Sequence, residues 1–392
     1  MKTTVILLLL VFFIGCSRTP APPPKEALTK NPWGALDLNI SSKKTPFGLR
    51  ASLGSSLLKK YQDANDTNIT YNILAISGGG SHGAYGVGLL NGWHKKGNMP
   101  KFDVVTGIST GSIIASFIFI GGDKIEHIAK IYTSIKTSDI YHYNFFKVFG
   151  GASITSTQAF KEIIKKEITP QILDAVAKEY KNGRRLYVGT TNIDAGKFVV
   201  WDMGAIAASN HPNKLQLYRD VIYASCAIPG IFDPQYFKIK YQQKEYSQLH
   251  IDGGMYAHVF MIGLLENWRE ILNVQDAKKF NVNVYVIGNR KYRYLNSHEA
   301  LSNDSAINIL INVSKHSVDL LYDRSLYRLY RACETKGFNF YYKGIDDDIK
   351  LNSYPHQFIP EDMALLYKTA FDEAKTKIKW QRVIAEDEVL KH

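Results

Sequence analysis

Three short stretches of this sequence contain the residue types that hydrolyse an ester through a serine. The first is a G-x-S-x-G pentapeptide running from Gly107 to Gly111, with Ser109 at its centre. It lies between a short apolar segment, residues 102–105, and a mostly apolar one, residues 112–120. This order predicts a nucleophile elbow, in which a sharp strand-to-helix turn exposes a serine hydroxyl. The flanking glycines suit such a turn because they permit unusual backbone angles and leave room for a substrate.

The second stretch is a glycine-rich loop, residues 78–83, which follows a predicted strand at 71–77 and leads into a predicted helix. Backbone N–H groups at the start of a helix bind anions. A nucleotide phosphate is one candidate ligand, but the loop lacks the Lys-Ser/Thr of a P-loop and the acidic residue of a dinucleotide fold. Because a serine elbow follows, an oxyanion hole is the favoured interpretation.

The third stretch ends a predicted strand, residues 249–251, in Asp252 followed by Gly253 and Gly254. A buried carboxylate in this position can accept the proton of a serine hydroxyl. The alternative is an ordinary Asp-Gly turn, which many proteins contain.

Together with the A-S-x-A-x-P-x-x-F segment at 224–232, these stretches resemble the patatin-like phospholipase family in their order. The resemblance spans residues 73–254, and residues 358–367 are similar to the carboxy-terminal part of bacterial members. It implies a three-layer α/β/α sandwich around a mostly parallel sheet. It also implies a Ser109–Asp252 dyad that acts on phospholipid or lysophospholipid without a metal or other cofactor. The implied oxyanion loop is formed by the backbone of Gly78, Gly79, Gly80 and Ser81.

Two positions depart from the family pattern. His82 stands where Arg or Lys is common, and His258 and Phe260 replace an Asn and a Pro after Asp252. His258 is close enough in sequence to Asp252 to alter the pKa of its carboxyl.

Three other functions remain open from the sequence. A Ser-His-Asp triad would need one of the later histidines, His211, His316 or His356, none of which lies in a motif. The same dyad could serve a thioesterase or peptidase. A lipid-binding lipoprotein could keep the fold without turnover.

The N-terminus predicts export and lipid anchoring. Residues 5–14 are ten consecutive apolar residues after Lys2, typical of a signal peptide and too short for a transmembrane helix, which needs about 20. Gly15 and Cys16 resemble a bacterial lipobox, with Cys16 as the lipidated residue and Ser17 favouring the outer membrane. Residues 18–34 are rich in proline and predict an extended tether.

Composition limits the remaining possibilities. We expect a signal peptide at 1–15, a tether and N-terminal extension at 16–70, a catalytic domain at 71–300, and a C-terminal helical part at 301–392 packed on the same domain. The net charge of +12 suits an anionic membrane surface, and an exported protein without a recognition motif is not expected to bind nucleic acid. Cys226 and Cys333 are expected to be buried free thiols.

Periodicity predicts several further elements. A β-hairpin is expected at 185–193 and 197–201, a strand at 281–287, and helices at 305–332 and 361–380. A shorter helix is expected at 55–61. Arg324, Arg328 and Arg331 share one face of the first long helix, for which a solvated face is favoured over a membrane-binding one.

Overall fold

A mixed β-sheet forms the centre of the molecule. The structure, a computed structural model, describes residues 21–38, 47–63, 68–144, 153–261, 280–291 and 306–384. The strand order is β10-β9-β1-β2-β5-β8-β7, and β6 also pairs with β5. The strands of this sheet are β1 (Ile69–Ile76), β2 (Val104–Gly107), β5 (Arg185–Asn192), β6 (Lys197–Asp202), β7 (Gln235–Tyr241), β8 (Lys244–Asp252), β9 (Phe280–Lys291) and β10 (Asn339–Ile345).

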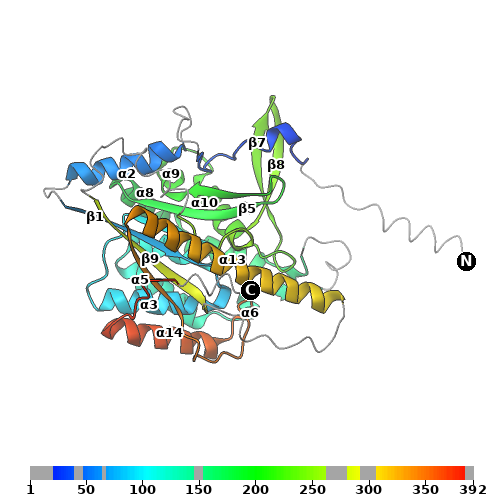
Figure 1. Cartoon of the computed structure of the whole chain (residues 1–392). Helices are drawn as coiled ribbons and strands as arrows, with labels where there is room; N and C mark the ends of the chain where they lie inside the picture. Colours follow the sequence, from blue (N-terminus) through cyan, green and yellow to red (C-terminus); the bar gives the residue numbers. More distant parts are fainter. Residues whose placement is uncertain are drawn as a thin grey trace, which may run out of the picture.

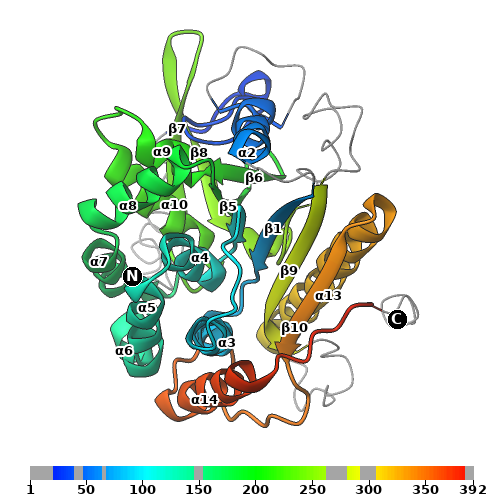
Figure 2. The ribbon, with the colours of Figure 1, turned by 90° about the vertical axis from the view of Figure 1, so that its left-hand side faces the viewer.

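Helices cover both faces of the sheet (Figures 1 and 2). On one face lie α3 (Gly83–Lys95), α4 (Thr110–Ile120), α5 (Asp123–Ser134), α7 (Gln158–Glu167), α8 (Pro170–Lys181), α9 (Met203–Ala208), α10 (Lys214–Ser225) and α14 (Pro360–Thr376). The other face is covered by α2 (Leu49–Asp63) and α13 (Ala306–Lys336). Short elements complete the chain: η1 (Lys25–Ala27), η2 (Gly80–His82), α6 (Thr137–Ile140), η4 (Gly253–Met255), and the antiparallel pair β3 (His142–Tyr143) and β4 (Thr155–Ser156). The predicted three-layer sandwich is therefore confirmed.

Strand β1 explains why two helical layers are needed. Its residues alternate between the two cores: Leu74 and Ile76 pack on the α3 side, and Ile73 and Ala75 pack on the α13 side. A parallel strand that is apolar on both faces is stable only when both are covered.

The directions of the strands determine which strand ends meet. β10, β9, β1, β2 and β5 run parallel, whereas β8 runs antiparallel to β5. β8 pairs only with the last three residues of β5, and Asp252 lies opposite Thr190. The end of β8 therefore reaches the level at which β2 ends, since Gly107 of β2 pairs with Val188 of β5.

Most of the predicted elements are present. The β5–β6 hairpin, β9 and both long helices are confirmed, although β9 and α13 extend further than predicted. Helix α2 also begins earlier than the predicted 55–61, because Leu49, Leu53 and Leu57 form one buried stripe at four-residue spacing. The C-terminal part expected to be helical also contributes the strand β10.

The described part of the proline-rich segment packs against the domain, which differs from the expected tether. Leu36 donates its N–H to the Val200 carbonyl, and Ala27 and Leu36 are buried. Trp33 stacks on His211 with ring centroids 4.2 Å apart. A few apolar side chains on the sheet edge thus order a segment whose composition predicted an extended chain. Cys16 and the predicted signal peptide lie outside the described residues.

Two smaller predictions concern the cysteines and the arginines of α13. Cys226 and Cys333 are buried free thiols, as expected. Arg324, Arg328 and Arg331 are exposed along α13. Within the described ranges, no helix is both long enough and apolar enough to span a bilayer.

Candidate active site

Ser109 lies in a strained turn between β2 and α4. Its backbone has φ 54° and ψ −129°, a conformation that residues with a side chain rarely adopt. The turn is tight on both sides: a Cβ on Gly107 would lie 2.2 Å from the Gly111 carbonyl oxygen, and one on Gly111 would lie 2.4 Å from that of Ile76. Both glycines are therefore required by packing. The predicted strand-turn-helix context of the elbow is confirmed.

A second serine, Ser225, stabilises the turn through two hydrogen bonds. The Ser109 N–H donates to Ser225 Oγ at 2.9 Å, and Ser225 Oγ donates to the Gly189 carbonyl at 2.8 Å. These two bonds connect the elbow to β5 through the last residue of α10. The sequence pointed to the segment around Ser225 without revealing this role.

Asp252 ends β8 in a buried position beside the elbow. It is 5% exposed, and its Oδ1 accepts a hydrogen bond from the Gly254 N–H at 2.7 Å. Burial raises the pKa of its carboxyl to about 6, against opposing effects of hydrogen bonding with Ser109 and Gly254 and of the positive charge of Arg290. The Asp-Gly-Gly turn has no spare room, since a Cβ on Gly253 would lie 2.5 Å from the Gly189 carbonyl oxygen.

The glycine loop is held close to Ser109 by the end of β9. Asn289, which is fully buried, donates Nδ2 to the Ser77 carbonyl and N–H to Ser77 Oγ, both at 2.8 Å. Its Oδ1 accepts the Gly86 N–H at 3.0 Å. One side chain thus connects the residue before the loop to the helix after it. No motif in the sequence signals this residue.

The loop also leaves no space for side chains. A Cβ on Gly78 would lie 3.1 Å from Ser109 Cβ, and one on Gly80, whose φ is +55°, would lie 1.9 Å from the Pro355 carbonyl oxygen. That carbonyl belongs to the segment that precedes α14, so the C-terminal part of the chain covers the loop.

Ser81 requires a correction. Its N–H donates to the Pro355 carbonyl at 2.8 Å, and its hydroxyl donates to the same oxygen at 3.2 Å. Because this backbone donor is occupied by the chain itself, the prediction that it serves an oxyanion is wrong. The candidate oxyanion loop is reduced to Gly78–Gly80.

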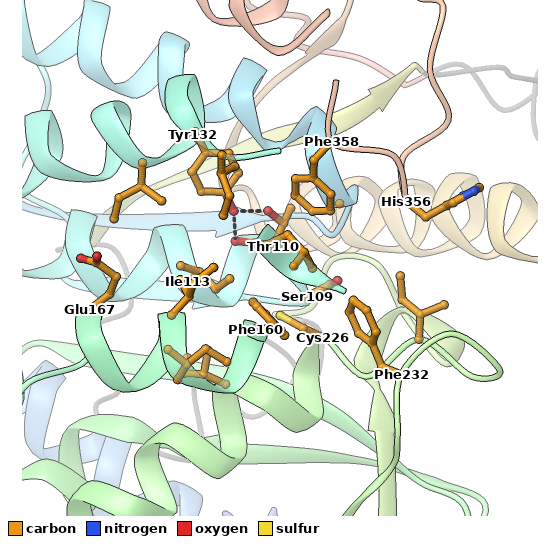
Figure 3. Close-up of a pocket in the computed structure, with 18 of the residues that line it drawn as sticks. Ser109, Thr110, Ile113, Tyr132, Phe160, Glu167, Cys226, Phe232, His356 and Phe358 are labelled. Carbon is orange, nitrogen blue, oxygen red and sulfur yellow. Dashed lines mark hydrogen bonds between the residues drawn. The ribbon is translucent and has the colours of Figure 1, made fainter. Parts of the chain in front are cut away.

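Two cavities meet at Ser109. The first, which we call the catalytic cavity, has a volume of about 90 Å³ and is lined by Gly78, Gly79, Gly80, Ser109, Asp252, His258 and Arg290, among others. The second, the apolar cavity, has a volume of about 70 Å³ and extends between α4, α5, α7 and α10 (Figure 3). Its wall includes Ile113, Ile131, Ile135, Phe160, Ile163 and Ile164. Gly80, Ser109, Ile228 and Pro355 line both.

The helix behind the elbow has two roles in this arrangement. Most of α4 is buried core, as the sequence predicted for residues 113–120. Ile113 nevertheless lines the apolar cavity together with Ser109. The walls supplied by α5 and α7 could not be predicted, since their isoleucines appear in the sequence only as ordinary amphipathic helices.

The histidines proposed for a triad do not approach Ser109 in a suitable way. His211 stacks on Trp33 and lines neither cavity. His356 lines the apolar cavity, but its ring stacks on exposed Tyr354 and points away from Ser109 in Figure 3. His316, on α13, also lines neither of them.

His258 does lie beside Asp252, as its place in the sequence suggested. A Cβ on Gly254 would lie 2.9 Å from the His258 ring and 3.1 Å from Asp252 Oδ1. Burial and the positive charge of Arg290 lower the pKa of His258 well below its usual range, so the ring is neutral. A neutral ring adds no charge that would shift the pKa of Asp252, and neither ring nitrogen has a hydrogen-bond partner within the described residues.

The positive charge near the site comes from a different position than the family pattern suggests. Burial lowers the pKa of His82 to about 4, so this residue is neutral as well. Arg290, three residues beyond the end of the predicted strand 281–287 and next to Asn289, brings a guanidinium to the catalytic cavity instead. The sequence alone did not connect β9 to the site.

Comparisons with known proteins identify one matching family model and two similar proteins. A family model described as patatin-like phospholipase matches residues 74–262. The chain is 30% identical over 195 residues to probable lipid hydrolase 463L of Invertebrate iridescent virus 6, covering 47% of this chain and 60% of that protein. It thus spans less than two thirds of that relative's length. Among solved structures, it is similar to VipD from Legionella pneumophila, with a TM-score of 0.37 and 12% identity, covering 78% of this chain and 66% of VipD.

Proposed function

Because the patatin-like phospholipase model matches residues 74–262 of this chain, we propose that the chain belongs to that family and is a lipid acyl hydrolase that cleaves carboxylic esters of membrane phospholipids or lysophospholipids. One observation carries the proposal: Ser109 and Asp252, from distant parts of the chain, line the same cavity as the Gly78–Gly80 loop. These are the nucleophile, the base and the oxyanion donors that acyl transfer needs.

In the first half of the reaction, Ser109 Oγ attacks the ester carbonyl carbon while the Asp252 carboxylate takes the hydroxyl proton. The carbonyl π electrons move to oxygen, and the resulting oxyanion is stabilised by backbone N–H groups of the glycine loop. When the tetrahedral intermediate collapses, the alcohol leaves with the proton from Asp252, and the acyl group remains on Ser109. A carboxyl pKa of about 6 suits this task, because the group is mostly ionised near pH 7 and still basic enough to accept a proton.

In the second half, a water molecule attacks the acyl-serine carbonyl and gives its proton to Asp252. Collapse of this intermediate releases the fatty acid, and Ser109 Oγ recovers its proton from Asp252. The same base therefore serves both steps, and no further ionisable group is needed.

The apolar cavity supports a lipid acyl chain as the substrate. It begins at Ser109 and is walled by isoleucine and phenylalanine side chains from four helices. Burying an alkyl chain there would contribute about 0.8 kcal/mol per CH₂ group. A peptide or a small thioester would leave this wall exposed to water.

The test is fatty acid release from phosphatidylglycerol and phosphatidylcholine vesicles and from their lysolipids. We expect Ser109→Ala and Asp252→Asn to lower kcat at least about 1000-fold. Two variants serve as matched controls and should keep most of the activity: Ser116→Ala, at a buried serine of α4, and Asp103→Asn, at a buried aspartate; neither residue lines a cavity at Ser109.

Each alternative function has its own outcome. Lipid binding without turnover in the wild type would identify a non-catalytic lipid-binding protein. Faster cleavage of acyl thioesters or peptides than of lipid esters would identify a thioesterase or peptidase. Activity that survives in Ser109→Ala would remove the proposed nucleophile.

We also propose that Cys16 carries the lipid that attaches the protein to the cell envelope, with the basic surface facing anionic lipid. The apolar run before Cys16 and the net charge of +12 support this. Metabolic labelling with a fatty acid should mark the wild type and not Cys16→Ser. Equal labelling of both would contradict the proposal.

A further inference from the structure

We propose that the catalytic cavity binds the phosphate group of the substrate through Arg290 and His258. This inference rests on the proposed function, since it assigns the side of Ser109 that holds the alcohol part of a phospholipid. It makes these two residues the determinants that favour phospholipids over neutral acylglycerols.

The connection of the two cavities sets the direction of the substrate. Gly80, Ser109, Ile228 and Pro355 line both, so a molecule whose ester carbonyl lies at Ser109 extends to either side. The apolar cavity suits the acyl chain, and the alcohol part then enters the catalytic cavity. In a glycerophospholipid the phosphate is only a few bonds from the ester oxygen, which places it among the residues of this second cavity.

Arg290 offers a positioned positive charge there. Its side chain is 12% exposed and forms an ion pair through Nη2 with Oδ1 of Asp319, which is 4% exposed. Asp319 fixes the guanidinium without lining the cavity itself. Among the described residues, Nε and Nη1 of Arg290 have no hydrogen-bond acceptor. The N–H groups on these two atoms can therefore donate to phosphate oxygens.

His258 offers a second polar group in the same cavity. It is 5% exposed, and both ring nitrogens are buried without a hydrogen-bond partner in the part of the chain that the structure describes. Tyr322 of α13 holds the ring in an edge-to-face contact at 5.8 Å. Leaving such a group unpaired costs about 1–3 kcal/mol, a cost that a hydrogen bond to a ligand would remove.

The charges of the cavity favour a phosphodiester over other anions. Asp252 and Asp319 place negative charge beside Arg290, so a multiply charged anion would be repelled. A phosphodiester carries one charge spread over two oxygens. Its oxygens can accept hydrogen bonds from a guanidinium on one side and from a neutral imidazole N–H on the other.

The test compares two substrates that share an acyl chain and a glycerol ester but differ in the phosphate. Lysophosphatidylcholine and the matching monoacylglycerol are presented in the same neutral detergent micelles. We expect Arg290→Gln to lower the ratio of kcat/KM for the lysophospholipid to kcat/KM for the monoacylglycerol roughly 10- to 100-fold. Any loss that comes from the raised pKa of Asp252 is shared by both substrates and cancels in this ratio. Lys291→Gln removes a charge one residue away on β9 and should leave the ratio unchanged, because Lys291 is bound to the Asp347 carbonyl on the surface.

A second variant keeps the inference testable if Arg290→Gln fails to fold. His258→Phe keeps an aromatic ring but removes both ring nitrogens, and we expect it to show the same selective loss for the lysophospholipid. An equal loss for both substrates, or no loss for either, in folded variants would overturn the phosphate site.

Binding separates this inference from the proposed function. In Ser109→Ala, an alkyl ether analogue of lysophosphatidylcholine should bind more tightly than the alkylglycerol, and adding Arg290→Gln should abolish the difference. If the wild type hydrolyses neither ester but this difference is observed, the phosphate site stands and the hydrolase proposal fails. Equal binding of both analogues overturns the phosphate site whatever the activity.

Discussion

The burial of Asp252 determines how both the activity and the stability of the protein depend on pH. In the folded protein the pKa of its carboxyl is about 6, above the model-peptide value of 3.8. The native state therefore binds this proton more tightly than the unfolded state does. The resulting stabilisation is complete below about pH 4 and is lost as pH rises through about 6.

The perturbation is Asp252→Asn, which replaces the carboxylate by a neutral group of the same shape. A difference of about two pKa units, at about 1.4 kcal/mol each, makes the ionised carboxylate cost about 3 kcal/mol in the native state. We therefore expect the variant to be more stable than the wild type by up to about 3 kcal/mol at pH 8 and by little at pH 4. Activity should be lost in the variant, an exchange of stability for function at one residue.

The assay is urea unfolding of both proteins at pH 4, 6 and 8, followed by circular dichroism. In parallel, kcat/KM of the wild type is measured from pH 4 to 9 and should rise with a midpoint near 6, because the free base must be ionised. Ser109→Ala supplies a control for the assignment. Removing its hydrogen bond, which lowers the pKa of Asp252, should move the midpoint of the stability change to higher pH.

Two results would refute this reasoning. A stability difference between Asp252→Asn and wild type that is the same at pH 4 and pH 8 would show that the carboxyl pKa is not raised by burial. A pH profile of kcat/KM with its midpoint near 4 would show that the base is solvated in the active enzyme.

Three further predictions concern the walls and supports of the site. Gly80→Ala should cost at least about 3 kcal/mol in unfolding free energy and abolish activity, because the new Cβ would clash with a backbone carbonyl. Gly97→Ala, at a glycine with positive φ but open space around it, should cost about 1 kcal/mol. Equal losses of the two variants in urea unfolding would contradict the packing argument. Asn289→Ala should cost about 2–4 kcal/mol in unfolding free energy and lower kcat more than it raises KM, since the two buried hydrogen bonds on either side of the glycine loop are lost. Asn283→Ala, half-buried on the same strand, should lose less than about 1 kcal/mol and keep its activity. Ile163→Trp should fill the apolar cavity and lower kcat/KM for 16-carbon relative to 8-carbon esters roughly 10-fold; an unchanged ratio would place the acyl chain elsewhere.

The local parts of the site could be predicted because their chemistry is encoded in consecutive residues. A tight elbow requires Gly107 and Gly111 around Ser109, and the glycine loop and the Asp-Gly-Gly turn follow the same logic. These features depend on backbone geometry over a few residues, which the order of those residues determines. The three-layer fold was predicted only through the resemblance of these motifs to a known family.

The tertiary structure decided what surrounds these parts. Only the antiparallel run of β8 brings Asp252 to the level of Ser109, and only the pairing of β9 with β1 brings Asn289 and Arg290 to the glycine loop. The Pro355 carbonyl occupies the Ser81 N–H because the chain before α14 folds back over the loop. Such contacts join residues up to about 270 positions apart. Their side chains carry no local signal, since an asparagine, an arginine or a proline gains its role there from the neighbour that folding supplies.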